Sequence, residues 1–304
     1  MKSVSCDLVK SLFEMEINSS LPANSCVGSY QLLMPQKSVV DDTTKVLILN
    51  ENKEAIAVLI CAYIKFGDLP KKAVLNSSEI KLKLNGEVSD VVISPLCYGE
   101  KAGVYYSLWQ YYSPFSSNKA IKYIQKNKLK SQIFSWLLSA SEQSKVKASE
   151  EEVREKFIKP LELLYENNSI RAEIKHEIGG QIKKIKNKKW QPFFCIEHND
   201  FWLGNILINK KNSYGISVID WAGANSKGFA IYDLIRISLS MKVSNAFFLN
   251  QLSLICEVLE CDIENSKGYL LSSFANLAMN LGDFPEERFV CLLDASCEYL
   301  FKKI

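Results

Sequence analysis

Short apolar runs separated by turn residues fill the first third of the chain. "KVLILN" (45–50) and "AIAVLICAYI" (55–64) flank the polar "ENKE", a pattern typical of a β-hairpin. "DVVISPLCYG" (90–99) and "GVYYSLWQYY" (103–112) predict a second strand pair across "YGEKAG". Between the pairs, "LNSSEIKLKLNG" (75–86) predicts a short helix with serine near its start and glycine at its end. We therefore expect a small, β-rich N-terminal lobe.

Farther along the chain the apolar spacing becomes helical. Over 119–138 apolar residues recur every three to four positions (Ile121, Ile124, Leu129, Ile133, Trp136 and Leu137). The stretch 150–186 continues this style, although Pro160 and the Gly179–Gly180 pair should kink or break it. A β-rich interval returns at 193–221, and helix-like segments then run to the end. The pattern predicts an α+β chain whose second lobe is larger, mainly helical, and contains an inserted hairpin.

That inserted hairpin gathers polar side chains at one end. "NILIN" and "GISVI" are apolar strands of similar length joined by "KKNSY", so Asn205 before the first strand and Asp220 after the second should lie side by side. Asp200 stands five residues upstream of Asn205, across a loop in which Gly204 allows a tight turn. A carboxylate beside an amide oxygen suits Mg²⁺ better than zinc. We therefore expect a magnesium site there.

Composition narrows the choice of compartment and partner. The 304 residues allow one large domain or two lobes, and a net charge of +3 gives no reason to expect a nucleic-acid or membrane partner. Nine cysteines, an odd number with no C-x-x-C, suit free thiols in a reducing cytosol. The N-terminus lacks the continuous apolar stretch of a signal peptide, and the longest apolar run (55–64) is roughly half a membrane span. We expect a soluble cytoplasmic protein.

The same polar loop carries a family resemblance. His198, Asp200 and Asn205 reproduce the H-x-D-x-x-x-x-N spacing of the protein-kinase catalytic loop, and Ile219-Asp220-Trp221 stands where kinases carry D-F-G. Over residues 195–240, "HNDFWLGNILI…VIDWAGANSKGFAIYDLIR" resembles the aminoglycoside phosphotransferase and choline kinase group more than protein kinases. That group carries H-G-D-x-x-x-x-N, then I-D-W or I-D-F, then a helix with Y-D-L.

The resemblance implies a function and a role for each residue. In-line phosphoryl transfer needs mainly alignment and charge neutralisation. Asp200 would orient the acceptor hydroxyl and take its proton, while Asn205 and Asp220 would hold Mg²⁺. His198 would support the loop structurally; Asp233 would either brace the loop or be an ordinary helix carboxylate. Trp202 and Trp221 are expected to be packing residues.

The resemblance also implies a fold, a set of cofactors and a class of acceptor. We expect a bilobal protein-kinase-like fold, with a nucleotide-covering lobe over residues 1–113 and a mainly helical lobe over 114–304. The cofactors would be ATP, with GTP as an alternative, and Mg²⁺. The acceptor would be the hydroxyl of a small molecule such as a sugar, an amino alcohol or an aminoglycoside. The sequence leaves the oligomeric state open.

The first lobe departs from the family pattern. Relatives place a phosphate-binding lysine in the third strand, and the corresponding position here falls near Ile60 or Cys61. Lys65 at the strand end could substitute, or it could be a solvated surface lysine; Glu79 fits the partner glutamate of the following helix only loosely. A single glycine, Gly28, stands where a Gly-rich loop would be. The alternative function is a kinase-like binding or regulatory module with weakened ATP affinity.

Other interpretations have less support. Only His176 and His198 are available to a histidine-rich metal hydrolase, and the G-x-S-x-G of a serine hydrolase is absent. The lysine run 183–189 is expected to be a solvated helix face rather than a nucleic-acid patch. From residue 241 onward the chain has nine acidic and five basic residues, an excess of negative charge that would suit a cationic acceptor. Exposed carboxylates on helices explain that excess equally well, and a neutral sugar fits as an acceptor as well as a cation does.

Overall fold

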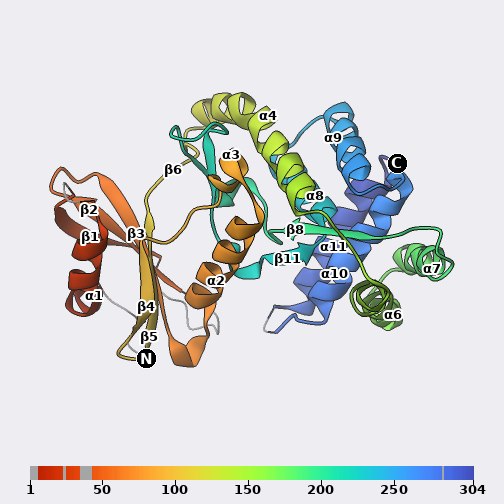
Figure 1. Ribbon diagram of the computed structural model, residues 1–304, viewed down its shortest axis with the longest axis horizontal. Helices are drawn as coiled ribbons and strands as arrows, with labels where there is room; N and C mark the ends of the chain where they lie inside the picture. Colours follow the sequence, from red (N-terminus) through yellow and green to blue (C-terminus); the bar gives the residue numbers. More distant parts are fainter. Residues whose placement is uncertain (1–5, 23–24, 35–42, 283) are drawn as a thin grey trace.

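Five antiparallel strands form the first lobe. In the computed structural model, which describes residues 6–22, 25–34, 43–282 and 284–304, the sheet order is β1-β2-β3-β5-β4 (Figure 1). The strands are β1 (Val27–Met34), β2 (Thr44–Asn50), β3 (Ala55–Tyr63), β4 (Cys97–Lys101) and β5 (Val104–Gln110). The β2–β3 pairing confirms the first predicted hairpin.

The second predicted strand pair is only partly right. Strands β4 and β5 do pair, but β4 begins at Cys97 rather than near residue 90. Pro95 lacks a backbone N–H for a ladder, and the residues before it follow a different course. Val92 forms a parallel bridge with Val218 of the second lobe, and the backbone N–H of Val218 donates to Val91 at 2.9 Å. This segment therefore ties the two lobes together.

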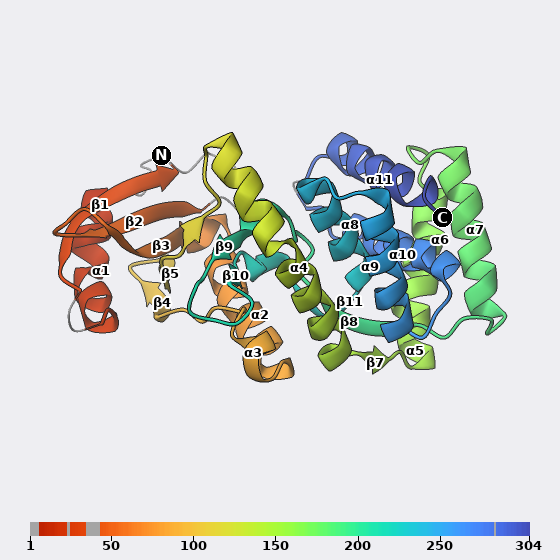
Figure 2. The same ribbon diagram turned by 90° about the horizontal axis from the view of Figure 1, so that it is seen from above.

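A helix that the strand pattern did not anticipate covers the outer face of the sheet. Helix α1 (Cys6–Ser20) buries Val9, Phe13 and Ile17, which are four residues apart and so share one face. They pack with β3 side chains such as Leu59 in a separate core. Figures 1 and 2 show α1 on the side of the sheet away from the helical lobe.

Helix α2 (Leu69–Lys83) lies between the sheet and the second lobe (Figures 1 and 2). It starts earlier than the predicted 75–86, because Pro70 occupies its first turn, where a missing N–H costs nothing. Gly86, with φ of 53°, begins the short helix α3 (Gly86–Ser89) instead of ending α2. The predicted helix exists, with shifted ends.

Helices dominate the second lobe, as predicted. They are α4 (Lys119–Ser144), α5 (Glu150–Val153), α6 (Lys159–Glu166), α7 (Ala172–Lys186), α8 (Ala230–Met241), α9 (Asn245–Val258), α10 (Ser266–Ala278) and α11 (Glu286–Phe301). A π-helical turn, Arg154–Ile158, precedes Pro160, which sits in the first turn of α6. The break predicted at Gly179–Gly180 is wrong: α7 continues through both glycines because buried isoleucines on either side hold its packed face.

Two other expectations at the level of helices have clear outcomes. The start of α4 is amphipathic in sequence only, since Ile121 is 49% exposed and Ile124 is 65% exposed, whereas its later apolar residues are buried. In the lysine run, Ile185 is buried and the lysines are largely solvated, which confirms a solvated face. None of the helices among the described residues is both long and apolar enough to cross a bilayer. The nine cysteines carry free thiols.

Short strands at the centre of the second lobe position the polar loop. Strand β8 (Phe193–Glu197) pairs with β7 (Val146–Lys147) and β11 (Asn225–Gly228). Strands β9 (Ile206–Ile208) and β10 (Ile216–Val218) are antiparallel, which confirms the inserted hairpin, and β6 (Ser113–Pro114) adds to β9.

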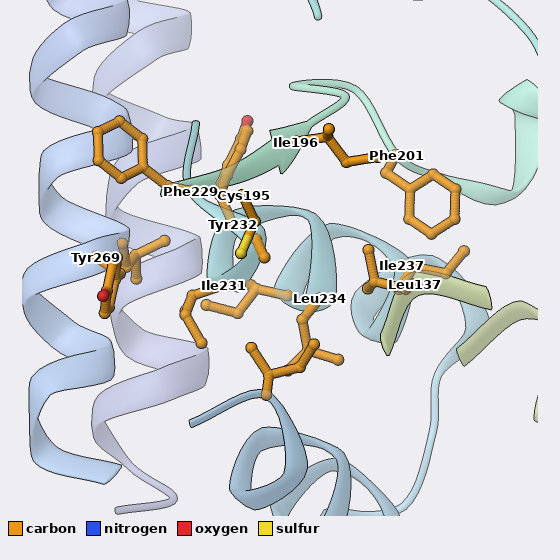
Figure 3. Close-up of a cluster of buried hydrophobic side chains, with 14 of the residues drawn as sticks. Leu137, Cys195, Ile196, Phe201, Phe229, Ile231, Tyr232, Leu234, Ile237 and Tyr269 are labelled. Carbon is orange, nitrogen blue, oxygen red and sulfur yellow. The ribbon is translucent and has the colours of Figure 1, made fainter. Parts of the chain in front are cut away.

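The core beneath this loop is densely apolar. Figure 3 shows Cys195 and Ile196 of β8 and Phe201 of the loop lying against side chains of α8 such as Ile231, Leu234 and Ile237. These side chains are at most a few per cent exposed. A loop that leaves such a core has fixed ends, because tightly packed interiors resist displacement.

Candidate active site

The loop after β8 contains one residue in an unusual backbone conformation. Asn199 has φ of 67°, in the left-handed region that glycine adopts freely and asparagine tolerates better than most residues. It occupies the place of the glycine in the H-G-D of the group that the motif resembles. Its Nδ2 donates to the carbonyl of Gly223 at 2.7 Å, so the side chain also fastens the two loops to each other.

The next residue, Asp200, is held by three donors. Its Oδ2 accepts hydrogen bonds from Asn205 Nδ2 at 2.9 Å and from the Trp202 indole N–H at 3.1 Å. Its Oδ1 forms an ion pair with the guanidinium of Arg236, on helix α8. Half of the Asp200 side chain is nevertheless exposed. The carboxylate is therefore fixed in direction and still open to a ligand.

Asn205 and Asp220 meet at the foot of the hairpin. Ile206 is paired with Val218, and the backbone N–H of Ile219 donates to the carbonyl of Asn205 at 3.0 Å, so Asp220 follows directly beside Asn205. The Nδ2 of Asn205 donates to both the backbone carbonyl and the carboxylate of Asp200, each at 2.9 Å. The Oδ1 of the amide consequently points away from Asp200. The structure thus brings together the three residues that the sequence grouped.

His198 links the loop to the same foot. Its ring is buried, and Nε2 lies 2.8 Å from the carbonyl oxygen of Ile219, which can only accept, so Nε2 carries the proton. Nδ1 then accepts from the backbone N–H of Asp200 at 3.3 Å. Burial lowers the pKa of this histidine, and Trp221 packs against it with ring centroids 4.6 Å apart. A neutral ring with both nitrogens engaged acts as a structural tie.

Two buried carboxyl groups lie beneath the loop. Oδ2 of Asp233 on α8 accepts from the backbone N–H of His198 at 2.5 Å, and Glu197 accepts from the Ser273 hydroxyl at 2.6 Å. Burial raises the pKa of Asp233 to about 7, and burial together with the charge of Asp233 raises the pKa of Glu197 well above its ordinary value. Asp233 therefore contacts the loop directly, unlike an ordinary exposed helix carboxylate.

Two cavities have the 3₁₀ turn Trp221–Gly223 as part of their walls. The first cavity, about 430 Å³, lies between the sheet and the second lobe. Asp220, Trp221 and Ala222 line it on the side of the second lobe. Its other walls come from β2, β3, α2 and the segment 109–112, and they are mainly apolar. We call it the donor cavity. The second, about 600 Å³, is lined by Asp200, Gly223 and residues of α8 and α11; we call it the acceptor cavity.

The first-lobe candidates do not join this site. Lys65 is exposed in the 3₁₀ turn Ile64–Phe66 after β3, with its ammonium 5.7 Å from the centre of the Tyr63 ring. Glu79 is exposed on α2. Neither residue lines the donor cavity. Gly28 has a packing reason instead: a Cβ there would lie 2.6 Å from the backbone oxygen of Asn50, so β1 needs glycine to approach β2 closely.

The structure adds residues that the sequence did not single out. Trp202 was expected to pack, but it is 43% exposed and its indole N–H binds Asp200, so only Trp221 fits that expectation. Gly204 has an ordinary φ, and its role differs too: a Cβ there would lie 2.4 Å from the Trp202 ring, which covers it. Arg236 falls one helical turn after Asp233, and that i, i+3 spacing was the available signal.

Sequence similarity alone does not place the chain among known proteins. No protein-family model matches this sequence, and no curated protein matches it significantly. The comparison by structure gives clear matches. The choline kinase LicA from Streptococcus pneumoniae superimposes with a TM-score of 0.52 at 16% identity, over 95% of this chain and 99% of that one.

Two further solved structures match over similar lengths. LicA in complex with AMP gives a TM-score of 0.50 at 16% identity, over 96% of this chain and 98% of that chain. A putative fructosamine-3-kinase from Haemophilus somnus 129PT gives 0.51 at 12% identity, over 92% and 96%. These likenesses span both lobes. The chain therefore has the bilobal kinase-like fold of these small-molecule kinases, as its motifs implied.

Proposed function

We propose that this protein is an ATP- and Mg²⁺-dependent phosphotransferase that moves the γ-phosphate to a hydroxyl of a small molecule. One observation carries the proposal. Asp220 lines the donor cavity, Asp200 lines the acceptor cavity, and the turn Trp221–Gly223 contributes lining residues to both. A phosphoryl group passing in line between two ligands needs its donor and acceptor aligned in this way. The lobes on either side are taken as residues 1–113 and 114–304.

The donor cavity has properties that suit a nucleotide. Its apolar walls would bury a base, and the charged side chains among its described lining, Lys45 and Asp220, face it from the two lobes. LicA, which has the same fold, has been crystallised with AMP. ATP is the proposed donor, and GTP remains the alternative.

Asn205 and Asp220 would hold the divalent cation. The Oδ1 of Asn205 points away from Asp200. The backbone hydrogen bond from Ile219 to Asn205 brings Asp220 next to Asn205 in the fold, so the pair could supply the oxygen ligands that Mg²⁺ prefers. Among the described residues no three His, Cys, Asp or Glu side chains form a metal-binding group, and phosphate oxygens would complete the coordination. When bound, the cation would neutralise charge on the nucleotide phosphates.

Asp200 would act on the acceptor. Its carboxylate would accept a hydrogen bond from the hydroxyl, orient the oxygen, and take the proton late in the transfer. Asn205, Trp202 and Arg236 fix the carboxylate, so little rearrangement is needed when the acceptor binds. His198 and Asp233 would hold the loop without touching the substrate.

The acceptor cavity favours neutral or anionic alcohols over cations. Its charged lining among the described residues is Asp200, Arg236 and Arg288. Arg236 is already paired with Asp200, while Arg288 stacks its guanidinium 5.5 Å from the Phe284 ring and has no carboxylate partner in the described part of the chain. The acids that suggested a cationic acceptor, such as Glu286 and Glu287, do not line the cavity. A sugar, or an alcohol bearing a carboxylate or phosphate, is the proposed class.

The test is a γ-phosphate-transfer screen. Labelled ATP and Mg²⁺ would be offered with sugars, sugar acids, amino alcohols and aminoglycosides to the full-length chain and to Asp200→Asn. We expect transfer to at least one neutral or anionic alcohol, and a loss of about 10²- to 10⁴-fold in kcat for Asp200→Asn. Transfer at the wild-type rate by Asp200→Asn would refute the mechanism.

The alternative, a kinase-like binding or regulatory module, makes a different prediction for the same screen. ATP would bind without passing its phosphate to any acceptor. The free thiols favour a reducing, cytoplasmic setting, which stays an expectation.

A further inference from the structure

Strand β3 presents an apolar residue where related kinases present a lysine. Along β3, Ala57, Leu59 and Cys61 point into the core under α1, so the alternate residues face the other way. Val58 and Ile60 accordingly line the donor cavity. Ile60 is one of the two positions at which the missing lysine was expected, and it is the one that faces the cavity. The position on β3 at which related kinases carry the phosphate-binding lysine therefore holds an isoleucine, which cannot bind phosphate.

The neighbouring strand supplies a lysine at the same level. Lys45 on β2 is paired directly with Ile60 on β3. Its neighbours Thr44 and Val46 are fully buried toward the opposite face, which turns Lys45 to the side of Ile60. Lys45 lines the donor cavity, as Ile60 does. Paired residues on adjacent strands have Cβ atoms about 4.5–5.5 Å apart, a displacement that a long lysine side chain can span.

We propose that Lys45 binds the phosphates of the nucleotide, so that the phosphate anchor of this chain has moved from β3 to β2. This inference rests on the proposed function, because it assumes that the donor cavity takes a nucleoside polyphosphate. It also removes the main sequence argument for a weakened binding module, since the absent β3 lysine is then a displacement and not a loss.

The charge distribution supports this assignment. Lys45 is the one cation among the described lining residues of the donor cavity, and Asp220 is the one anion. The two belong to opposite lobes, so a polyphosphate between them would meet a lysine on one side and the proposed cation site on the other. Because most of the remaining lining is apolar, such a contact would be less weakened by water than one on the surface.

The absence of an internal partner also matters. Within the described residues the ammonium group of Lys45 forms no hydrogen bond or ion pair. On α2, Glu79 is exposed. Asn76 of the same helix reaches the 3₁₀ turn Trp221–Gly223 instead, and its Nδ2 donates to the carbonyls of Trp221, Ala222 and Ala224 at 3.0–3.2 Å. Asn76 therefore fastens α2 to that turn while leaving the lysine unneutralised. A partly buried ammonium without an ionic partner, in a mainly apolar cavity, is suited to an anionic ligand.

The experiment measures nucleotide affinity by calorimetric titration, with no acceptor present. ATP and adenosine would each be titrated into the wild type, Lys45→Met and Lys53→Met. Lys53 is an exposed lysine in the turn of the same hairpin and serves as the matched control. We expect Lys45→Met to weaken ATP binding about 10- to 100-fold and to leave adenosine binding unchanged, while Lys53→Met matches the wild type for both.

A second variant tests the displacement itself. Adding Ile60→Lys to Lys45→Met would return the ammonium to β3, and we expect ATP affinity to recover while adenosine affinity stays constant. Unchanged adenosine affinity in Lys45→Met would show that this variant is folded, and recovery in the double variant would show that the defect lies in the phosphate contact. No recovery in a double variant that still binds adenosine would contradict a displacement from β3.

The outcomes separate the inference from the proposed function. If the wild type binds ATP and Lys45→Met binds it equally well, the inference is overturned and the proposed function stands. Loss of ATP affinity in Lys65→Met with none in Lys45→Met would likewise overturn the inference, and would assign the phosphate contact to the lysine at the strand end. If the wild type binds neither ATP nor GTP, both the proposed function and the inference are overturned.

Discussion

At the scale of single residues, the proposed chemistry would depend on a few side chains whose positions are fixed by neighbours distant in sequence. The spacing of His198, Asp200 and Asn205 was visible in the chain, because all three belong to one loop. Arg236 and Lys45 were not, because their relevance depends on which side chains α8 and β2 bring beside Asp200 and Ile60. Local spacing predicts a loop, and tertiary packing determines what surrounds it.

The buried carboxyl pair gives the protein a particular pH dependence. In the folded state the pKa of Asp233 is raised from 3.8 to about 7 and that of Glu197 is raised well above 4.5, so the folded chain keeps protons that the unfolded chain has released. Their contribution to stability is complete below the unfolded pKa values and declines as the pH rises toward and through the folded ones.

We therefore expect the free energy of unfolding to fall between about pH 5 and pH 8, and to fall less steeply in Glu197→Gln. Each full proton contributes a slope of about 1.4 kcal/mol per pH unit. Glutamine keeps the shape of the neutral acid and cannot ionise, so stability at pH 5 should change little. Urea unfolding at several pH values measures both slopes, and identical slopes would contradict a role for the carboxyl pair.

Asn199 offers a test of the backbone conformation. Because its φ is 67°, Asn199→Gly should fold normally and lose only the contact with Gly223, whereas Asn199→Val should cost about 1–3 kcal/mol of unfolding free energy. Thermal or urea unfolding of the two variants makes the comparison. Equal stability of the glycine and valine variants would mean that the left-handed conformation is not required.

At the scale of elements, the hairpin β9–β10 was the most predictable feature and the helix ends were the least. Two apolar strands of equal length around a polar turn leave one reasonable antiparallel pairing. The structure shows that pairing, with Ile206 opposite Val218. Helix α7 continues through Gly179–Gly180 because packing outweighs the low helix propensity of glycine. The segment 90–93 was expected to be part of a strand paired with 103–112, but it forms a single bridge to β10 instead. An apolar sequence predicts burial and does not determine which segment it pairs with.

The turn before β9 should be sensitive to one added methyl group. A Cβ at position 204 would lie 2.4 Å from the Trp202 ring, so Gly204→Ala should displace the indole and break its hydrogen bond to Asp200. We expect kcat for phosphate transfer to fall about tenfold, the effect of losing one donor to a charged group. In a Trp202→Ala background the same substitution should have little further effect. Additive losses in the double variant would show that Gly204 acts by another route.

At the scale of the whole molecule, the proposed phosphate transfer depends on two cavities that meet at one turn. The sequence predicted two lobes, with the candidate catalytic loop in the second, and the kinase-like fold bears out the bilobal architecture. The sequence could not give the charge of the acceptor cavity, because none of the described acids in the last quarter of the chain lines it. Net composition carries no information on which residues face a cavity.

The arginine in that cavity leads to a prediction on specificity. Once an acceptor has been identified, Arg288→Ala should raise KM for an anionic alcohol about 10- to 100-fold and leave KM for a neutral analogue within about threefold, with kcat unchanged. The reason is that Arg288 lines the cavity without a carboxylate partner among the described residues. Steady-state kinetics with a matched pair, such as a sugar acid and its sugar, provides the measurement. An equal rise in KM for both members would assign Arg288 a packing role.

The most direct measurement of the central claim is the Mg²⁺ dependence of ATP affinity in Asp220→Asn and Asp200→Asn. If Asp220 serves the donor side and Asp200 the acceptor side, Mg²⁺ should tighten ATP binding in the wild type and in Asp200→Asn, and the tightening should be lost in Asp220→Asn. Equal loss in both variants, or no effect of Mg²⁺ on the wild type, would contradict the division of the site between the two aspartates.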